Sequence, residues 1–346
     1  MQRVIVYQEY GMFAGWPANH GAWQRGDEFL VGFLRGKHGD GAFHEIIEPF
    51  EKVQARSLDG GETWTVEVPN VDFNCAIEPI RTGPPTKFDG TCDIARVCGR
   101  YDTGGETCVQ QGGFYVSRDF GREWLGPYPF LGLETIFGGD NHNTSRTRVI
   151  GNRFYLSSAT QDKWGSDWVF SALLENGVFR LWEIVCKDRD RNARAVMPDV
   201  VQLDKLRVCV MRRKGRGRNW IDAFGSVNGG LWNQLAANCV ADTGFANGNP
   251  PALAEVNGRL VCCYGNRSTR RMYAKASDDG GLTWRGHKVL NQSTNRDLGY
   301  PQLFKRKDGQ LVCVYYISKS LYDSAHIEAC IFDPMKMHGL DDVERD

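Results

Sequence analysis

The sequence predicts an all-β protein that folds as a single β-propeller domain over residues 1–346, with four-stranded antiparallel blades. Three observations predict this fold. A short peptide containing Asp, Gly and Trp recurs along the chain, and proline-marked apolar segments follow one another at intervals of about 50 residues. The composition, with 40 Gly, 10 Trp and 12 Tyr, is typical of proteins with many tight turns and aromatic anchors.

The recurring peptide begins with Ser and ends with Trp. Its copies occupy residues 57–64, 117–124 and 277–284, and a less regular copy occupies 226–232. Each copy has an Asp or Asn that can bond its own turn, a Gly that tolerates positive φ, and a Trp that can anchor the turn in a neighbouring layer. Four copies indicate a repeat architecture. We expect the repeated Asp residues at outer turns, far from the axis: Asp59, Asp119 and Asp279.

A second pattern marks the first strand of each repeat. Pro198, Pro250 and Pro301 follow one another at intervals of 52 and 51 residues. A two-residue turn and a second apolar segment come after each of them; the turns are Asp-Lys at 204–205, Asn-Gly at 257–258 and Asp-Gly at 308–309. Such turns between apolar segments are strong hairpin signals, and a Pro at the start of a strand costs no ladder hydrogen bond. Each repeat therefore predicts one blade.

The same order of elements begins earlier in the chain at Trp16-Pro17, near Cys92-Asp93 and at Ser145-Arg146. Counting inner strands in this way gives six blades. The last repeat, residues 300–334, has only three predicted strands. We expect the N-terminal strand, residues 4–7, to supply the fourth and to close the ring, which removes the free sheet edges.

The bulk composition excludes several classes of partner. The 42 basic and 42 acidic residues cancel, so no overall field recruits nucleic acid or an anionic membrane. No apolar segment is long enough to span a bilayer. Five of the 11 Cys lie in apolar strand-like segments and suit buried thiols, and no zinc motif is present. We expect a monomer without metal or cofactor that is cytoplasmic, or secreted or periplasmic if a leader has been removed.

Residues at the starts of the inner strands should meet in a bowl on the axis. Arginine forks bind carboxylates, amides bind hydroxyls and aromatic rings contact the apolar face of a sugar, so this set suits a carboxylated sugar. The alternative is that the arginines pair with carboxylates of neighbouring blades. Arg212 opens the densest basic run, residues 212–218, which is either a solvated hairpin tip or an anion-binding element. The expected substrate-binding residues are Trp16, Asn19, Trp23, Arg146, Arg194, Arg212, Asn249 and Tyr300.

His20 is the sharpest catalytic candidate. We expect it in an inner strand between Trp16 and Trp23, where small neighbours leave room for an imidazole that acts as general acid or base. The alternative is a purely structural histidine. His142 and His326 are further acid/base candidates at the rim. The remaining histidines lie in polar, loop-like segments and are expected at the surface: His38, His44, His287 and His338.

Ordinary glycosidase chemistry uses two carboxylates. Four acidic residues can be placed near the axis, but the sequence selects no pair among Asp93, Asp199, Asp222 and Asp297. Neither a serine-hydrolase elbow nor a phosphate loop is present.

The repeated peptides resemble the Asp-box of sialidases, which indicates fold more than function. A sialidase would have Arg-Ile-Pro where this chain has Gly15-Trp16-Pro17, so sialic acid cleavage is disfavoured. A closer resemblance, to glycoside hydrolase family 145 and related uronate-specific polysaccharide lyases, is carried by residues 14–21, 27–33, 195–201, 219–222, 241–253 and 297–301. It implies seven blades. It also implies action on L-rhamnose linked α-1,4 to D-glucuronic acid, the cap of arabinogalactan and gum arabic side chains, or on ulvan-like polymers.

In the hydrolase branch, the resemblance implies that His20 acts from the posterior face with help from the uronate of the substrate. In the lyase branch, it implies a His that removes the C5 proton while Arg neutralises the carboxylate. Thr91 aligns with that His, so Tyr300 or His142 would have to replace it. The expected function is hydrolysis that releases terminal L-rhamnose, with His20 as general acid/base. The alternatives are a uronate lyase that uses the anterior Arg/Tyr bowl and a non-catalytic carbohydrate-binding propeller.

Overall fold

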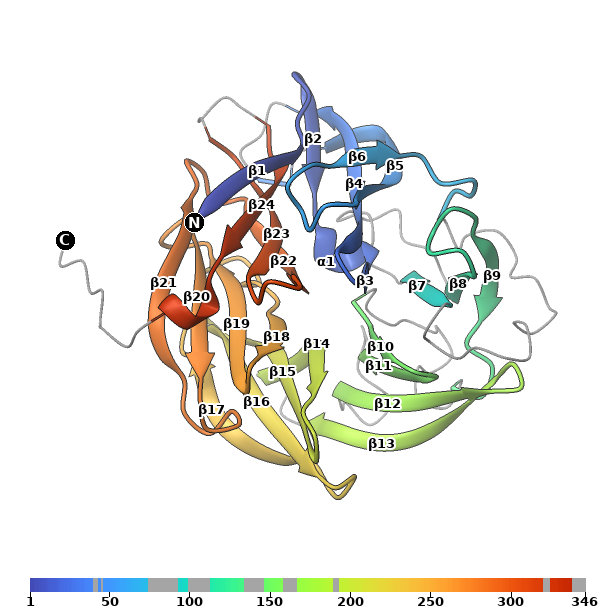
Figure 1. Ribbon diagram of the computed structural model, residues 1–346, viewed down its shortest axis with the longest axis vertical. Coiled ribbons are helices and arrows are strands. Elements are labelled where there is room, and N and C mark those ends of the chain that lie inside the picture. The colour runs from blue at the N-terminus through green and yellow to red at the C-terminus, as the bar shows by residue number, and fades with distance from the viewer. Residues whose placement is uncertain are drawn as a thin grey trace.

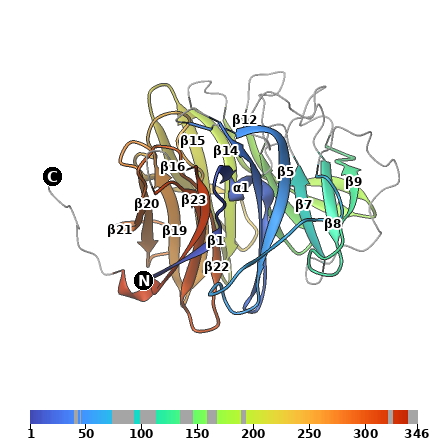
Figure 2. The ribbon, with the colours of Figure 1, turned by 90° about the horizontal axis from the view of Figure 1, so that it is seen from above.

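The computed structural model describes residues 1–39, 43–44, 46–73, 93–98, 113–133, 146–157, 167–188, 193–319 and 324–337. Within these residues the strands form six antiparallel sheets, which Figure 1 shows as blades around a central axis. In side view, the strands run across the thickness of the disc (Figure 2). The all-β prediction and the count of six inner strands are confirmed, and the described residues form no seventh blade such as the resemblance implies.

The first three blades are made from the first half of the chain. The first blade contains β2 (Met12–Gly15), α1 (Pro17–His20), β3 (Ala22–Arg25), β4 (Glu28–His38), β5 (Ile46–Ser57) and β6 (Thr65–Glu67). The described strands of the second are β7 (Ile94–Cys98), β8 (Gly113–Ser117) and β9 (Leu125–Pro129). The third contains β10 (Arg148–Ile150), β11 (Arg153–Ser157), β12 (Asp167–Glu175) and β13 (Val178–Asp188).

The remaining blades follow the proline-marked repeats. The fourth contains β14 (Ala193–Gln202), β15 (Leu206–Gly215), β16 (Asn219–Val227) and β17 (Asn233–Val240). The fifth contains β18 (Ala252–Val256), β19 (Arg259–Asn266), β20 (Arg271–Ser277) and β21 (Arg285–Gln292). The sixth contains β22 (Gly299–Lys305), β23 (Leu311–Ile317), β24 (His326–Phe332) and β1 (Gln2–Tyr7), followed by the 3-10 turn η1 (Pro334–Lys336).

The N-terminal strand closes the ring as the sequence predicts. β1 pairs antiparallel with β24, with Gln2 opposite Ile331 and Val4 opposite Ala329. Apolar side chains then fill the space between neighbouring blades. The rings of Phe29 and Phe304, for example, stack 4.7 Å apart between the first and sixth blades. This packing fixes the blades around the axis, because buried aromatic pairs resist sliding of one layer over another.

The Asp-containing peptides lie at outer turns, each between the last two strands of its blade. Asp59 accepts hydrogen bonds from the backbone of Glu62 and Thr63, at 3.0 and 2.9 Å, and from the Thr63 hydroxyl at 2.6 Å. Slight burial raises the pKa of Asp59, but these hydrogen bonds outweigh it and lower the pKa to about 2. Asp279 has a similar environment, and its pKa is also about 2. The prediction that these residues are structural turn elements is thus confirmed.

One expectation about the first blade is wrong. His20 lies on the one-turn helix α1 and not in an inner strand, because Trp16 has a left-handed backbone with φ of 55° and the next residue is a proline. Pro17 at the first helical position has a φ suited to a helix and no N–H to leave unpaired. The helix separates β2 from β3, which both pair with β4.

Candidate active site

Six polar side chains gather on the axis where the inner strands begin. We call them the axial cluster; the members are Arg212 on β15, Arg267 after β19, Asp297 before β22, Tyr300 on β22, Tyr316 on β23 and His44 between β4 and β5. Their elements belong to the fourth, fifth, sixth and first blades. The axis therefore brings together groups that lie up to hundreds of residues apart in the chain.

His44 and Asp297 form a close pair within the cluster. The His44 Nδ1 atom lies 2.9 Å from Asp297 Oδ1, and the His44 backbone N–H donates to Asp297 Oδ2 at 2.7 Å. A carboxylate on Nδ1 favours the tautomer with its proton on that atom, which leaves Nε2 as the basic nitrogen. The His44 side chain is 23% exposed, whereas Asp297 is buried. The geometry therefore suits general acid/base chemistry at His44.

Tyr316 and Arg267 hold Asp297 from the buried side. The Tyr316 hydroxyl donates to Asp297 Oδ1 at 2.5 Å, and Arg267 Nη2 donates to that hydroxyl at 3.2 Å. Burial alone would raise the pKa of Asp297, but the His44 contact, the Arg267 charge and the Tyr316 hydrogen bond lower it overall. Burial also raises the pKa of Tyr316, with the Asp297 charge adding to the effect. Asp297 is thus an anion and Tyr316 a neutral donor.

Arg212 carries a buried charge without a carboxylate partner in the described structure. Its guanidinium donates to the Asn247 carbonyl, and Nη1 lies 3.3 Å from Met197 Sδ and 3.5 Å from the Tyr300 hydroxyl. Burial lowers the pKa of Arg212, although Tyr300 partly offsets this. A buried cation that is bonded only to neutral groups is costly. An anionic ligand group would offset that cost, so Arg212 is a candidate anion receptor.

The backbone around the cluster is unusually strained. Non-glycine residues seldom adopt positive φ, and in structures such outliers concentrate at functional sites. Half of the twelve described non-glycine residues with positive φ lie in or next to the cluster: Trp16, His44, Met197, Ala246, Asn247 and Tyr300. Three of them directly precede a proline in an inner strand or in α1, namely Trp16, Met197 and Tyr300.

Several residues expected to bind substrate do meet at this cluster. Tyr300 lies beside Arg212, and its backbone N–H donates to Asn249 Oδ1 at 3.1 Å. The Trp16 ring lies edge-on to His44, with the centroids 5.1 Å apart, and its other neighbours include Tyr316 at 6.1 Å. His44 was expected at the surface, but its side chain is only 23% exposed and lies against Asp297. The sequence does not reveal this contact, because 253 positions separate the two residues.

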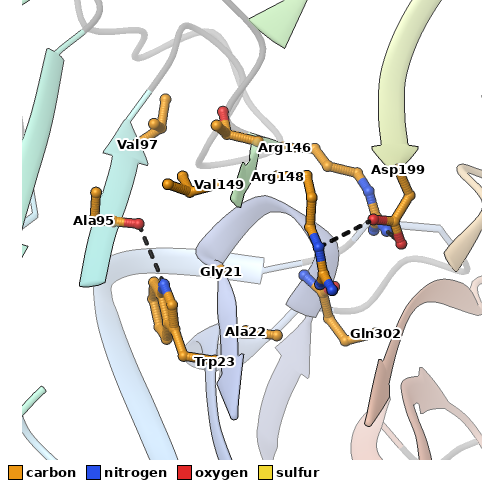
Figure 3. Close-up of a pocket in the computed structure, with 11 residues that line it drawn as sticks. Gly21, Ala22, Trp23, Ala95, Val97, Arg146, Arg148, Val149, Asp199 and Gln302 are labelled. Carbon is orange, nitrogen blue, oxygen red and sulfur yellow. Dashed lines mark hydrogen bonds and ion pairs between the residues drawn. The ribbon is translucent and has the colours of Figure 1, made fainter. Parts of the chain in front are cut away.

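Arg146 lies nearby but is already neutralised. Its Nη2 donates to Asp199 Oδ2 at 2.8 Å and its Nη1 to the Pro301 carbonyl at 2.9 Å. Figure 3 shows Arg146 and Arg148 directed toward Asp199 across a cavity on the axis, with Trp23 donating to the Ala95 carbonyl on its far side. The alternative that an axial arginine pairs with a carboxylate of another blade therefore describes Arg146.

His20 is completely buried and lies against the second blade. Its Nδ1 atom is 3.0 Å from Arg96 Nη2, and Arg96 lies over the Phe73 ring at 3.7 Å. Because a guanidinium only donates, this Nδ1 accepts and carries no proton. Asn19 is buried on the same helix, where its N–H donates to the Trp16 carbonyl. The assignment of His20 as acid/base stays a prediction.

The other candidate residues are dispersed. His326 is buried on β24, 3.6 Å from Glu328, and is not a rim residue. Arg194 lies on β14 opposite Lys214. His142 and Thr91 fall outside the described residues.

Among the residues that the structure describes, no group of three or more His, Cys, Asp or Glu is arranged to hold a metal ion. No helix in the described ranges is long and apolar enough to cross a membrane.

Comparison with known proteins gives structural likenesses only. No family model matches the chain, and no curated protein matches it in sequence. A protein of unknown function from Dyadobacter fermentans is similar in structure, with a TM-score of 0.67, 18% identity, and coverage of 95% of this chain and 97% of that one. The sialidase Hz136 from a Hadza microbial source has a TM-score of 0.59 and 15% identity. The alignment covers 94% of this chain and 66% of the sialidase chain.

The GH93 α-L-arabinofuranosidase of Fusarium graminearum, in complex with arabinobiose, has a TM-score of 0.57 and 12% identity, and 97% of this chain and 99% of that chain are covered. Identities this low carry no information about activity. The comparisons therefore establish that this chain shares the propeller fold of a sialidase and of a GH93 arabinofuranosidase.

Proposed function

We propose that the protein is a carbohydrate-active enzyme that hydrolyses a glycosidic bond next to a uronic acid, with the axial cluster as its active site. The supporting observation is the combination of an oriented histidine, His44 on Asp297, with the buried cation Arg212, whose hydrogen-bond partners among the described residues are all neutral. The first supplies acid/base chemistry and the second a receptor for a carboxylate. Structural likeness to glycoside hydrolases agrees with this proposal.

In this proposal, the uronate carboxylate lies at Arg212, with Arg267 adding positive charge beside it. His44 Nε2, when protonated, gives its proton to the leaving glycosidic oxygen, and it then accepts a proton from the attacking water. Asp297 stabilises the charged imidazole, since it touches Nδ1. Only one carboxylate, Asp297, belongs to the cluster, so the substrate's own uronate is the group available to stabilise positive charge at the anomeric carbon.

The specific linkage that we propose is terminal L-rhamnose α-1,4 to D-glucuronic acid. It combines an apolar methyl-bearing sugar with a neighbouring carboxylate. The Trp16 ring beside His44 suits the first, and Arg212 suits the second. Among uronate-containing polymers, gum arabic and related arabinogalactans carry this cap.

A uronate lyase is the second candidate, and the tyrosines of the cluster favour it. In β-elimination a base removes the C5 proton, the C4–O bond breaks, and a C4=C5 double bond forms, while a cation stabilises the charge that develops on the carboxylate. His44 or Tyr300 would be the base and Arg212 the stabilising cation. This reaction requires no second carboxylate.

One incubation distinguishes these functions. The protein is mixed with gum arabic, and free rhamnose and the ultraviolet absorbance of unsaturated uronate are followed together. Hydrolysis releases rhamnose without the absorbance, elimination produces the absorbance, and a binding propeller produces neither. The His44→Gln and His20→Gln variants are then compared: loss of turnover with His44→Gln alone supports the axial cluster, and loss with His20→Gln alone contradicts it and supports the posterior site.

A further inference from the structure

A groove lies beside the loop that joins the fourth and fifth blades. We call it the rim groove; its lining includes Lys214, Arg218, Asn219, Asp242, Phe245 and Asn247. The loop that forms one of its walls, residues 241–249, also contacts the cluster. Arg212 donates to the Asn247 carbonyl and Arg267 to the Ala246 carbonyl at 2.6 Å. The groove and the cluster therefore share this loop, which joins one to the other.

The loop at 241–249 is fixed in place by tight packing. A Cβ at Gly244 would lie 2.5 Å from the Arg267 backbone nitrogen, and one at Gly248 would overlap the Thr243 hydroxyl. Asn219 Nδ2 donates to the Gly244 carbonyl at 2.8 Å. Such close backbone approach excludes a range of loop conformations. The groove is thus preformed, and binding would cost little ordering entropy.

The charge of the groove is positive on balance. Lys214 and Arg218 lie along it, and Arg218 donates to the Asn238 side chain at 2.6 Å, which is a neutral partner. The carboxylate in the lining, Asp242, is committed to the loop, because its Oδ1 accepts from the Gly244 backbone at 2.8 Å. A polyanion therefore meets two cations and one carboxylate that is already occupied.

An aromatic ring completes the groove. Phe245 is 38% exposed, which is unusual for a large apolar side chain on a polar rim. The Arg296 guanidinium lies 4.8 Å from the centre of this ring. The Phe43 ring lies 6.2 Å from it, centroid to centroid. A ring that is held by a guanidinium and a second ring, and is still partly exposed, suits stacking against the apolar face of a pyranose.

We propose that the rim groove binds the continuation of an acidic sugar chain, so that the protein distinguishes a polymer from a disaccharide. The sugar that follows the bound uronate would stack on Phe245, and the next carboxylate would lie at Lys214 and Arg218. This inference rests on the proposed function, since it extends the substrate of the same site. It assigns the groove to chain-length specificity and leaves the bond cleavage to the cluster.

Binding measurements test this proposal without relying on turnover. Rhamnose-capped glucuronate-containing oligosaccharides, a disaccharide and a hexasaccharide, are titrated calorimetrically at low ionic strength into the wild-type protein, into Lys214→Gln/Arg218→Gln, and into Phe245→Ala. A control, Arg285→Gln/Lys288→Gln, removes two positive charges as well, but from the outer strand β21. We expect the groove variants to weaken hexasaccharide binding roughly tenfold, equivalent to one good polar or stacking contact, and to leave disaccharide binding unchanged.

Three results would overturn the inference: equal affinity of the wild-type protein for both lengths, unchanged hexasaccharide binding in the groove variants, or an equal loss in the control. Failure of the proposed function has a different signature. In that case the wild-type protein prefers the hexasaccharide through the groove and yet cleaves neither compound. The two outcomes are therefore separable in the same set of samples.

Discussion

His44 and Asp297 are joined by two contacts, one from the imidazole Nδ1 at 2.9 Å and one from the backbone N–H at 2.7 Å, although 253 positions separate them in the chain. Both carboxylate oxygens of Asp297 are used, so the acid fixes both the position of the His44 main chain and the orientation of its ring. Tyr316 and Arg267 hold the acid in turn. The arrangement is that of an oriented base with a buried anion behind it.

Replacing Asp297 by Asn should therefore damage turnover far more than binding. The amide cannot stabilise a protonated imidazole, and its nitrogen can favour the wrong tautomer of His44. We expect kcat on a rhamnosyl-glucuronate substrate to fall by about 10²- to 10⁴-fold, with KM changed little. Steady-state kinetics over a pH series measures this. Undiminished kcat in a variant that is folded by circular dichroism would contradict the role of the pair.

Arg212→Lys should reveal the carboxylate receptor. Lysine keeps the charge but loses the planar fork, so we expect KM for the uronate substrate to rise by about tenfold or more and KM for its methyl ester to be nearly unchanged. Arg207→Lys is the matched control, since Arg207 is also buried but pairs with Glu183 at 2.6 Å. Equal effects on acid and ester would show that Arg212 does not bind the carboxylate.

Gly299→Ala should unfold the centre of the site. Gly299 has φ of 115°, and a Cβ there would overlap the Asn249 side-chain oxygen that accepts from Tyr300. We expect the free energy of unfolding to fall by several kcal/mol, more than the ~1–2 kcal/mol of left-handed strain alone. Gly309→Ala provides that reference, because φ there is 83° and nothing lies within 4 Å of its Cβ. Urea titration compares the two, and similar losses would argue against close packing at Asn249.

The repeated Asp turns should give the protein an acid-sensitive stability. The pKa of Asp59 and of Asp279 is about 2 in the folded protein, below the value of about 3.9 for an unfolded Asp. Their contribution is therefore present above about pH 4 and is lost as the pH falls toward 2. The Asp59→Asn/Asp279→Asn variant should be less stable than the wild-type protein at pH 7. It should also lose less of its stability than the wild-type protein does as the pH falls from about 4 toward 2. Urea unfolding across this range, with exposed Asp204→Asn as control, measures the slope.

The sequence predicts the fold well because the repeated features are local. An Asp–Gly–Trp turn, or a proline near the start of a strand, predicts the structure of the few residues around it. The role of β1 follows from the strand that the last repeat lacks. The α1 helix was missed because the left-handed conformation of Trp16 precedes an otherwise strand-like segment. A single residue with unusual φ leaves little trace in the sequence pattern.

The site is less predictable because it is assembled from four blades. The regular positions of Asn249 and Tyr300 at the starts of inner strands predict them, and the dense basic run at 212–218 points to Arg212. His44 and Arg267 were not predicted as site residues: His44 lies in a polar loop, and nothing local relates it to Asp297. The sequence does hold one signal for Arg267. It directly follows β19, the second strand of the fifth blade, and Arg212 comes at the end of the apolar part of β15, the second strand of the fourth. His142 and Thr91 lie outside the described residues.

The pairing of β1 with β24 has a consequence for the time at which the protein becomes complete. Gln2 leaves the ribosome long before its partner Ile331, because the two pair although they lie at distant positions in the chain. At translation rates of about 5–20 residues per second, β1 waits on the order of half a minute for the strand it pairs with. Blades can form one by one during synthesis, but the ring and the sixth-blade part of the axial cluster form only when the last repeat has emerged. A nascent chain stalled before β24 would therefore display five blades and an incomplete axial cluster.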